Sequence, residues 1–585
     1  MSSYAAPLRD LRFVLEELLE HRSLRLPEYQ ELSGELVTAI IEEAARLAGE
    51  VWAPLNRRGD EQGCRLENGE VHTPTGFAEA YRAFAEGGWN GIGSDPAHGG
   101  QGLPEVVASA VQEMWHSANM ALALCPLLTA GAVEALAQHG SEELKSRYLE
   151  KLISGEWTGT MNLTEPQAGS DLSMVRTRAV PEDAHYRLSG QKIFITWGEH
   201  DCADNIIHLV LARLPDAAEG NRGISLFLVP KFLVDEQGRL GKRNDVSCVS
   251  LEHKLGIHGS PTCVLSFGEH EGAIGYLVGE PGRGLQHMFT MMNAARHKVG
   301  IQGIGVAERA YQQARAYAAE RVQGRTPEAR GGRPAVLSEH YDVRRMLLSM
   351  RARLESLRAL ALLSASEMDH ARHASTEDER QRAQQRADLY TPVVKAFSTD
   401  QAVDITSLGI QVHGGMGYIE ETGAAQYLRD SRIAPIYEGT NGIQALDLAG
   451  RKIHRDGGTV LSDVLDEVAA CADALTAEAQ LADLGVSLHQ GVVDLRRAVA
   501  IVLARGDDAD ALQALATPLL ALTGHVLCAW QMGRAALIAQ AALVTGDDEA
   551  FYRAKLASAD FVLRQWLPIG RAQLAAIEAN PGVFD

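Results

Sequence analysis

The sequence has little of what marks a disulfide-rich, exported or metal-binding protein. Its seven cysteines are odd in number and never closer than fifteen residues apart, so no CxxC pair exists for a metal or for redox exchange. The opening stretch, MSSYAAPLRDLRFVLEELLEHR, meets charged side chains too early to form the apolar run of a signal peptide. We therefore expect reduced thiols, no metal site and a soluble, cytoplasmic protein.

Long apolar runs are also missing. Residues 120–133 form one of the two most apolar stretches and are too short to cross a bilayer, which takes about 20 apolar residues. The other stretch, residues 514–531, is interrupted by Pro518 and His525. We expect no membrane span.

Basic residues are outnumbered. Lysine and arginine total 55 against 76 aspartates and glutamates, a formal net charge of -21, which disfavours binding to nucleic acid or to an anionic membrane. Hydrophobic residues at 46% and charged residues at 22% are close to the globular average and exclude a disordered or collagen-like chain. At 585 residues the chain has material for about four domains of ~150 residues each.

Periodicity divides the chain into helical and β-rich parts. Residues 5–160 favour helices, because apolar side chains recur at helical spacing, and a Gly- and Pro-rich loop at 87–104 interrupts them. Residues 165–280 instead hold short β-prone runs separated by turn residues; these runs are 192–197, 206–214, 223–229 and 263–267. The helical period then returns, with a Gly- and Pro-rich break at 324–334, and a further amphipathic region follows a short linker at 455–459.

This order predicts a mainly helical protein with a compact β domain in the middle. Helices and strands do not alternate as in a parallel α/β protein, so a nicotinamide-type Rossmann domain is not expected. The glycines of residues 300–305 (GIQGIG) lie in a helical pattern without a preceding strand. They indicate close helix packing and not a dinucleotide fingerprint.

Residues 164–171 (TEPQAGSD) predict a tight turn at the entry to the β domain. Hydroxyls and backbone N–H groups cluster in it, and such a loop can hold a polar ring edge or a phosphate. An ordinary turn capped by Ser170 or Asp171 explains the same residues.

Two further motifs have a functional and a structural interpretation. In residues 192–197 (KIFITW), strand alternation puts Phe194 and Thr196 on one face, which suits a flat heterocycle or, as is commoner, a cross-strand core pair. In residues 411–418 (QVHGGMGY), three glycines follow a helix and allow close approach to a ligand. The alternative is a helix C-cap with Gly414 in the left-handed region.

Residues 436–444 (IYEGTNGIQ) carry the sharpest feature. Glu438 stands between apolar residues and a glycine, directly before a new helix, where partial desolvation raises the pKa of a carboxyl toward that of a general base. In the structural alternative, Asn441 and Gln444 form a capping box and Glu438 faces the helix dipole. Both interpretations can hold together.

Five motifs in this order resemble the acyl-CoA dehydrogenase family. They are TEPQAGSD (164–171), YRLSGQKIFITWGEHD (186–201), ERVQGR (320–325), QVHGGMGY (411–418) and LRDSRIAPIYEGTNGIQ (428–444). The match runs from about residue 9 to 454, roughly three quarters of the chain. The length, the added C-terminal helices and the opening YAAPLRDLRFVLEELL resemble a longer subgroup whose members act on fatty acyl-CoA or 3-methylmercaptopropionyl-CoA.

The resemblance implies a fold that is mainly α with a central β domain. The expected domains are an N-terminal helical domain (1–160), a middle β-barrel-like domain (161–282), a C-terminal four-helix bundle (283–455) and an additional C-terminal helical domain (456–585). It also implies FAD, bound between β domain and bundle and at the subunit interface of a homodimer.

The implied FAD contacts come from all five motifs and from Leu163, which directly precedes the first of them. They are Leu163, Thr164, Gly169, Ser170, Phe194, Thr196, Arg321, Gln323, Gln411, Gly414, Gly415, Thr440 and Asn441. Arg321 and Gln323 would reach the diphosphate or adenosine end, and the residues of QVHGGMGY would meet the FAD of the neighbouring subunit. Thr440 and Asn441 would hold diphosphate oxygens on backbone N–H groups.

Glu438 matches the family's catalytic base, and the implied reaction converts an acyl-CoA to the trans-2-enoyl-CoA. The Glu438 backbone N–H and a flavin ribityl hydroxyl would bind the thioester carbonyl, the carboxylate would take the α-proton, and flavin N5 would accept the β-hydride. Substrate contacts are expected from Ser170, Arg296 and Gly439; for Arg296, a CoA contact and a solvated helix charge are equal alternatives. Some family members place the base directly before the arginine that matches Arg296, but Ala295 stands there in this chain.

The chain departs from the family pattern in two places. A Phe-Gly pair usually follows the Glu-Arg of ERVQGR, but Gly324, Arg325 and a Gly- and Pro-rich insertion stand here, so the adenosine-side contacts differ from the usual ones. A glutamine that is common two residues after the EGT threonine is replaced by Gly442.

Three alternatives to the dehydrogenase remain open. An acyl-CoA oxidase would share the base and the flavin but let oxygen reach the reduced cofactor. A DNA-associated flavoprotein of this family would need a basic C-terminal domain, whereas residues 461–585 carry sixteen acidic and eight basic side chains, a balance of -8. A noncatalytic homologue would hold FAD only as an element of the fold.

The implied partners are an acyl-CoA substrate, an electron-transfer flavoprotein as acceptor and a second copy of the chain, and the implied pathway is fatty-acid β-oxidation. The C-terminal helices are expected to pack on the bundle or across the dimer, because their apolar stripes need a partner. The acyl group stays open, since one methylene changes binding by only ~1–3 kcal/mol.

Overall fold

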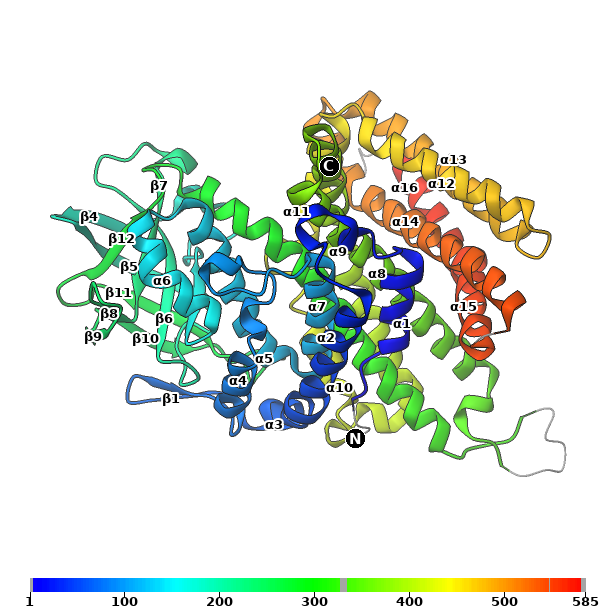
Figure 1. Ribbon diagram of the computed structural model, residues 1–585, viewed down its shortest axis with the longest axis horizontal. Coiled ribbons are helices and arrows are strands. Elements are labelled where there is room, and N and C mark those ends of the chain that lie inside the picture. Colours follow the sequence, from blue (N-terminus) through cyan, green and yellow to red (C-terminus); the bar gives the residue numbers. More distant parts are fainter. Residues whose placement is uncertain (1–3, 327–333, 547, 580–585) are drawn as a thin grey trace. The chain divides into compact units, whose positions relative to one another are not determined.

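The computed structural model describes residues 4–326, 334–546 and 548–579 (Figure 1). The expected Gly- and Pro-rich break falls partly outside the described residues, at 327–333, as does the end of the expected C-terminal domain, 580–585. The chain forms two compact units. Unit 1 comprises Met1–Ala45, Pro104–Ser117 and Arg296–Asp585, and unit 2 comprises Arg46–Leu103 and Ala118–Ala295.

Unit 2 holds the β domain. Seven strands of its eight-stranded sheet follow the order β10-β11-β5-β12-β7-β6-β3, and β4 pairs with both β5 and β6. Because β4 joins β5 to β6, the strands β5, β12, β7, β6 and β4 form a closed ring, which confirms the expected barrel-like domain. The strands are β3 (Trp157–Asn162), β4 (Arg178–Glu182), β5 (His185–Thr196), β6 (Asn205–Arg213), β7 (Ile224–Pro230), β10 (Val246–Leu251), β11 (Thr262–Phe267) and β12 (Ala273–Val278).

Two short hairpins accompany this sheet. β8 (Phe232–Val234) pairs with β9 (Leu240–Arg243), and β1 (Arg65–Glu67) pairs with β2 (Glu70–His72). The β1–β2 hairpin lies in a stretch that was expected to be helical. The sequence did not indicate it, because strands of three residues are too short to show a period of two.

Helix α6 (Glu142–Ser154) covers part of the sheet of unit 2. Its buried side chains Tyr148 and Leu149 belong to the same apolar cluster as Trp157 of β3 and Leu209 of β6. Strand β7 is buried along its whole length, so its continuous apolar run is what a strand covered on both faces requires. This unit also contains α3 (Ala53–Gln62) and α4 (Phe77–Glu86).

The bundle of unit 1 is built on three long helices. These are α7 (Gly284–Glu320), α8 (Tyr341–His373) and α9 (Glu377–His413), with the shorter α10 (Ala424–Ser431) packed on α9, and with α1 (Leu8–Arg12), α2 (Gly34–Leu47) and α5 (Glu105–His139) nearer the N-terminus. Of α5 and α7, residues 105–117 and 296–320 belong to unit 1 and the rest to unit 2. A Cβ atom on Gly300 would lie 2.6 Å from the Val394 carbonyl oxygen, and one on Gly305 would lie 2.8 Å from that of Glu113. The glycines of GIQGIG therefore serve close packing of α7 on α9 and α5, as the sequence predicted.

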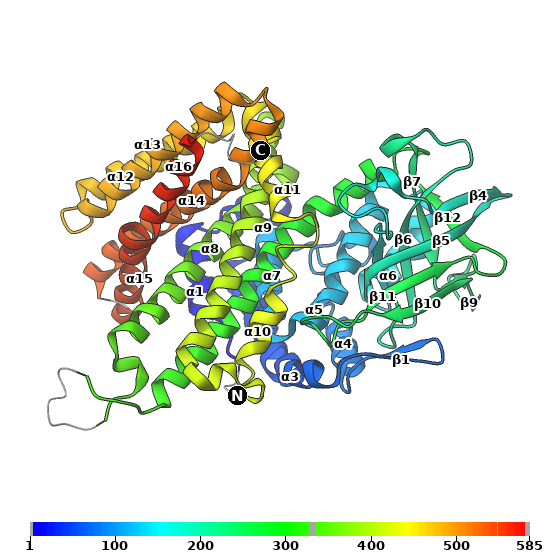
Figure 2. The same cartoon turned by 180° about the vertical axis from the view of Figure 1, so that it is seen from behind.

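Five further helices of unit 1 lie toward the C-terminal end of the described chain. They are α12 (Thr459–Ala477), α13 (Ala482–Arg505), α14 (Ala509–Thr545), α15 (Glu549–Phe561) and α16 (Gly570–Glu578). Helices α12 and α13 run side by side as a hairpin (Figure 2), and α14 packs against α8, α9 and α11 (Asn441–Leu446). In this contact Phe397, His525 and Trp566 form an aromatic cluster with ring centroids 4.8–5.5 Å apart. The C-terminal helices thus bury their apolar stripe on the bundle of their own chain.

A buried charge network ties the N-terminal segment and α15 to the bundle. The guanidinium of Arg358 donates to Asp10 at 2.5 Å, to Glu308 at 2.9 Å and to both carboxylate oxygens of Glu113. Lys555 of α15 also pairs with Asp10. Arg358 is 1% exposed, so its charge depends entirely on these partners for compensation.

Among the described residues, two helices are long and apolar enough to cross a membrane, α5 and α14. Of their most apolar windows, 83% and 67% respectively are buried inside the protein. That burial is what core helices of a folded domain show, since their apolar side chains already have protein partners.

Candidate active site

Residues 437–441 connect the bundle to α11 through a left-handed turn. Glu438 has φ 54° and Gly439 has φ 81°, so two consecutive residues adopt the left-handed conformation. For a residue with a side chain this conformation costs roughly 1–2 kcal/mol. Such strain gathers at functional sites, where the surrounding structure imposes it. Among the described residues, Glu438 is one of nine non-glycine residues with positive φ. The strained turn therefore agrees with the sequence motif but does not identify the base by itself.

The surroundings of Glu438 alter its acidity. Burial raises the pKa of its carboxyl above the ordinary value, although the positive charges of Arg296 and Lys395 act in the opposite direction. A general base works best when its pKa approaches the operating pH, which a raised carboxyl pKa favours. The site can thus accept a proton from a carbon acid held beside it.

Arg296 lies on α7, close to the start of α11. It is 5% exposed and its guanidinium stands 3.7 Å from Asp447, which pairs with Arg451 at 2.5 Å as well. The alternative of a solvated helix charge is therefore wrong for Arg296. The preceding residue, Ala295, is buried and offers no carboxylate to rival Glu438.

Thr440 caps the start of α11. Its Oγ1 accepts a hydrogen bond from the Ile443 N–H at 3.3 Å. Gln444 donates its side-chain amide to the Glu438 carbonyl at 3.4 Å. The expected capping box of Asn441 and Gln444 is therefore wrong: the cap is one residue earlier, and Gln444 stabilises the turn at Glu438 instead.

Asn441 is tied to its own chain by both backbone and side chain. Its N–H donates to the Pro435 carbonyl at 3.0 Å and its side-chain amide donates to Asp400 at 2.7 Å. The backbone N–H expected to bind the FAD diphosphate is thus already used. Lys395 donates to Asn441 Oδ1 and to the Gly439 carbonyl, both at 2.8 Å. Sequence reasoning missed Lys395, whose only signal was a charge inside the apolar run VVKAF.

The expected flavin contacts of unit 2 lie in the loop after β3 and on β5. They are Leu163, Thr164, Gly169, Ser170, Phe194 and Thr196, all partly or fully exposed. A buried lysine fixes this loop: Lys192 Nζ donates to the Leu163 carbonyl at 2.9 Å and to Glu165 at 2.8 Å. Sequence reasoning missed this ion pair, because its members stand 27 residues apart in the chain.

Phe194 sits at a bulge. The register of β5 against β11 shifts between Lys192 and Ile195, and Phe194 has φ 59°. The bulge leaves Lys192 buried and Phe194 57% exposed, so a cross-strand core pair is wrong for this phenylalanine. An exposed aromatic ring in a strained conformation offers a flat apolar surface to a ligand.

The Glu165–Lys192 pair makes unit 2 sensitive to acid. Burial alone would raise the pKa of Glu165, but the Lys192 charge and hydrogen bonds from Thr177 and Arg176 lower it to about 2. Because its folded-state pKa is depressed, Glu165 stabilises the protein above pH 4.5, and this contribution is lost as the pH falls toward 2. We expect wild type to exceed E165Q by up to about 3 kcal/mol in unfolding free energy at pH 6, the difference shrinking below pH 4.5 in urea titrations. A constant difference down to pH 3 would contradict this account.

The expected FAD contacts of unit 1 form two groups. Thr440 and Asn441 lie beside Glu438, and the other five residues lie at or just after the C-terminal ends of α7 and α9. Arg321, Gln323, Gln411, Gly414 and Gly415 are all exposed. The stacking of Tyr317 on His413, with ring centroids 4.5 Å apart, joins the C-terminal ends of α7 and α9 beside them. At 1.5 Å per residue, Glu320 lies roughly 36 Å along α7 from Arg296, and Gln411 lies roughly 24 Å along α9 from Lys395. One chain therefore does not bring these residues to its own Glu438.

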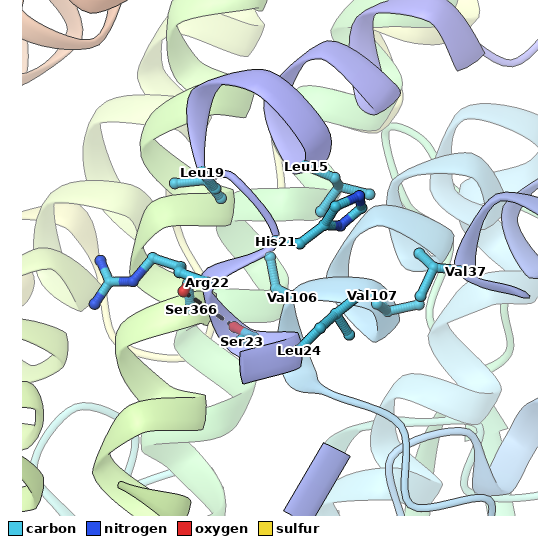
Figure 3. Close-up of a pocket in the computed structure, with 10 residues that line it drawn as sticks. All are labelled: Leu15, Leu19, His21, Arg22, Ser23, Leu24, Val37, Val106, Val107 and Ser366. Atoms are coloured by element: carbon cyan, nitrogen blue, oxygen red, sulfur yellow. Dashed lines mark hydrogen bonds between the residues drawn. The ribbon is translucent and has the colours of Figure 1, made fainter. Parts of the chain in front are cut away.

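A small cavity in unit 1 is a poor candidate for a substrate site. Figure 3 shows the side chains around it, mostly aliphatic ones such as Leu15 and Val107, with Ser23 and Ser366 hydrogen-bonded at 3.0 Å. Its volume is about 10 Å³, which is room for one water molecule. Among the residues that the structure describes, no group of three metal-binding side chains was found either.

Comparison with known proteins identifies the family. The acyl-CoA dehydrogenase N-terminal, middle and C-terminal domains match residues 35–156, 160–269 and 282–453, and an acetyl-CoA dehydrogenase C-terminal-like domain matches 464–583. The chain belongs to the acyl-CoA dehydrogenase family. It is accordingly an oxidoreductase that acts on acyl-CoA with FAD as cofactor, and the resemblance seen in the five motifs is confirmed.

Relatives cover nearly the whole chain. A 3-methylmercaptopropionyl-CoA dehydrogenase of Ruegeria pomeroyi is 48% identical over 572 residues, 97% of this chain and 96% of that protein. The broad-specificity linear acyl-CoA dehydrogenase FadE5 of Mycobacterium tuberculosis is 35% identical over 99% of this chain and 98% of its own. The crystal structure of Caenorhabditis elegans ACDH-11 in complex with C11-CoA superposes with a TM-score of 0.75 at 23% identity, over 97% of this chain and 92% of that one, and shares the fold.

The donor groups of unit 2 fit a flavin. Phe194 presents an exposed ring, and the hydroxyls of Thr164, Ser170 and Thr196 donate to no other described residue. Hydroxyl donors beside a flat apolar surface match a ring system with polar edges and an apolar face.

Proposed function

We propose that this chain catalyses the α,β-dehydrogenation of an acyl-CoA thioester to the trans-2-enoyl-CoA, with Glu438 as the base. The observation that carries the proposal is the left-handed turn at Glu438 and Gly439, which holds a partly desolvated carboxylate in the segment that matches the family's base. Strained residues gather at functional sites, which favours a catalytic role over a noncatalytic fold element.

Glu438 has two roles in the proposed reaction. Its backbone N–H binds the thioester oxygen and stabilises the negative charge that develops there as the α-proton leaves. Its carboxylate takes that proton. FAD, when bound, accepts the hydride from the β-carbon. Ser170, Arg296 and Gly439 are proposed to contact the substrate.

The substrate class is proposed from the relatives. The 48% identical protein is named for 3-methylmercaptopropionyl-CoA and FadE5 for linear acyl-CoA. We propose that this chain accepts one or both, and that it acts in the β-oxidation of acyl groups in the cytoplasm. The test is kcat/KM for 3-methylmercaptopropionyl-, butanoyl-, octanoyl- and palmitoyl-CoA with an artificial electron acceptor. Turnover of none of these thioesters would contradict the proposed substrate class.

The proposed electron acceptor is an electron-transfer flavoprotein. An acyl-CoA oxidase is the alternative, since it would share Glu438 and the flavin contacts. Oxygen uptake separates the two: a dehydrogenase reduces the flavoprotein quickly and consumes little oxygen, whereas an oxidase forms one hydrogen peroxide per enoyl-CoA without any added acceptor.

We further propose a homodimer in which each flavin site is completed by the partner copy. The separation of Arg321 and Gln411 from Glu438 along α7 and α9 supports this arrangement. So does the exposed apolar surface around Gly414, where Met416 is 48% and Tyr418 is 88% exposed.

Mixing two inactive variants tests the shared site. E438Q removes the proposed base, and R321E removes a proposed flavin contact that lies directly after α7. Each homodimer is therefore inactive. Random exchange of subunits gives mixed dimers with one intact site, and we expect about a quarter of wild-type activity after co-refolding. No recovery, with mixed dimers shown by native mass spectrometry, would place both groups outside a shared site.

A further inference from the structure

Lys395 is a buried cation whose hydrogen bonds go to the catalytic segment. It lies on α9, its residue is 0% exposed, and its Nζ donates to the Gly439 carbonyl and to Asn441 Oδ1, both at 2.8 Å. Among the described residues, no carboxylate lies within salt-bridge distance of this ammonium group, and the charged groups around it are Asp400, Glu438 and Arg296. Neutral oxygens only partly replace the hydration that a buried ammonium group gives up.

Asn441 links the lysine to the rest of α9. Besides accepting from Lys395, its side-chain amide donates to the Ala396 carbonyl at 3.1 Å, to Thr399 Oγ1 at 3.0 Å and to Asp400 Oδ1 at 2.7 Å. The side chain of Asn441 is thus fully engaged by one helix. Lys395 and Asn441 together fix the segment on both sides of Thr440.

The consequence for Glu438 is geometric. Gly439 follows Glu438 directly, and both residues are left-handed. Holding the Gly439 carbonyl on α9 restricts the rotation that would let Glu438 relax to an ordinary conformation. The Gln444 amide holds the Glu438 carbonyl at 3.4 Å from the other side. Two side chains from two helices therefore impose the turn that the local sequence disfavours.

We propose that Lys395 is a positioning residue for the dehydrogenation: its ammonium group holds the Glu438–Gly439 turn and thereby aims the carboxylate and the backbone N–H of Glu438 at the substrate. This inference rests on the proposed function of Glu438. Lys395 acts through the turn and through its positive charge, which favours the ionised carboxylate, and it does not touch the substrate.

The test compares K395M, K395R and K452M in the holoenzyme. K395M removes the ammonium group and keeps an unbranched stem, while K395R keeps the charge in a larger group. K452M is the matched control, because Lys452 follows α11 and pairs with Asp388 at 3.0 Å, away from the turn. The readouts are the anaerobic rate of flavin reduction against substrate concentration and pH, and an infrared titration of the carboxyl signal that E438Q lacks.

For K395M we expect the maximal rate of flavin reduction to fall about 100-fold, because a misplacement of the carboxylate by about 1 Å has a cost of this size. The substrate concentration that gives half of the maximal rate should change little. The lost positive charge raises the Glu438 pKa, so the midpoint of the rate profile and of the infrared titration moves up by roughly one pH unit. The flavin content of K395M should equal that of wild type, and so should the rate and the titration of K452M. K395R should retain more activity than K395M.

Wild-type rates and an unchanged titration in K395M would overturn the proposal. If K395M does not fold, N441A replaces it, since it removes one acceptor and the tie to α9 but keeps the lysine; a rate loss of about 10-fold is expected, and none would overturn the proposal. The infrared titration separates this inference from the proposed function. Failure of every acyl-CoA to reduce the wild-type flavin would contradict the function, while the shift between wild type and K395M would still decide the role of Lys395.

Discussion

Replacing Glu438 by glutamine is expected to slow flavin reduction by an acyl-CoA by about 10³- to 10⁴-fold. General bases contribute on the order of 10²–10⁴ to rates, and here the proton leaves a carbon atom, where no water molecule is a ready substitute. The amide keeps the size and the left-handed backbone of Glu438 but has no basic oxygen. Anaerobic stopped-flow measurement of E438Q against wild type gives the ratio directly.

Two controls accompany this prediction. Flavin content and the unfolding midpoint of E438Q should equal those of wild type, because the turn is held by backbone and neighbouring side chains. The wild-type rate should fall as the pH drops through the raised pKa of Glu438, since only the ionised carboxylate takes a proton. A pH-dependent rate of similar size in E438Q would assign the proton transfer to another group.

Replacing Arg358 by methionine is expected to lower the free energy of unfolding by about 3–5 kcal/mol. The change removes the cation shared by Asp10, Glu113 and Glu308 and leaves three buried carboxylates with only the charge of Lys555, which pairs with Asp10, close by. Because Asp10 belongs to the N-terminal segment and pairs with Lys555 of α15, the loss should spread to both. Hydrogen exchange should show α1 and α15 losing protection before the rest of the bundle.

The matched control is R344M on the same helix. Arg344 is exposed, so its replacement should change the unfolding free energy by at most about 0.5 kcal/mol. Equal effects of R344M and R358M in urea titrations would show that the buried network contributes no more than a surface charge.

The order of helices and strands was predictable because the local spacing of apolar residues indicates it. The period changes from helical to β-rich near residue 165 and back near 281. The return to helix agrees with the start of α7 at Gly284, but the first strand of the sheet, β3, begins at Trp157, inside the stretch expected to be helical. The barrel was expected from the family resemblance alone. Local periodicity does not show its closure, since it depends on β4, a short and mostly exposed strand that pairs with both β5 and β6. The β1–β2 hairpin was missed for the same reason of length.

The candidate site was predictable where one residue type carries the chemistry. Glu438 stood out as a carboxylate between apolar residues and a glycine. The two buried lysines did not stand out: Lys395, which holds the turn at Glu438, lies 44 residues from Gly439, and Lys192, which fixes the loop after β3, lies 27 residues from Glu165 in the chain. Only the packing of α9 on α11, and of β5 beside the loop after β3, brings each lysine to its acceptor.

The position of the helix cap shows the limit of local rules. Asn441 is a good N-cap residue, and so is Thr440. The structure uses Thr440, because the side chain of Asn441 is taken by Lys395 and α9. A tertiary contact thus decides between two local preferences of similar strength.

One anaerobic turnover tests the central claim most directly. Wild-type holoenzyme is mixed without oxygen with a substoichiometric acyl-CoA from the panel that it accepts best, and both the loss of oxidised-flavin absorbance and the thioester product are measured. The account predicts one trans-2-enoyl-CoA formed for each flavin reduced, with the α-hydrogen leaving as a proton and the β-hydrogen leaving as a hydride. Flavin that stays oxidised, or a reduced flavin without enoyl-CoA, would contradict it.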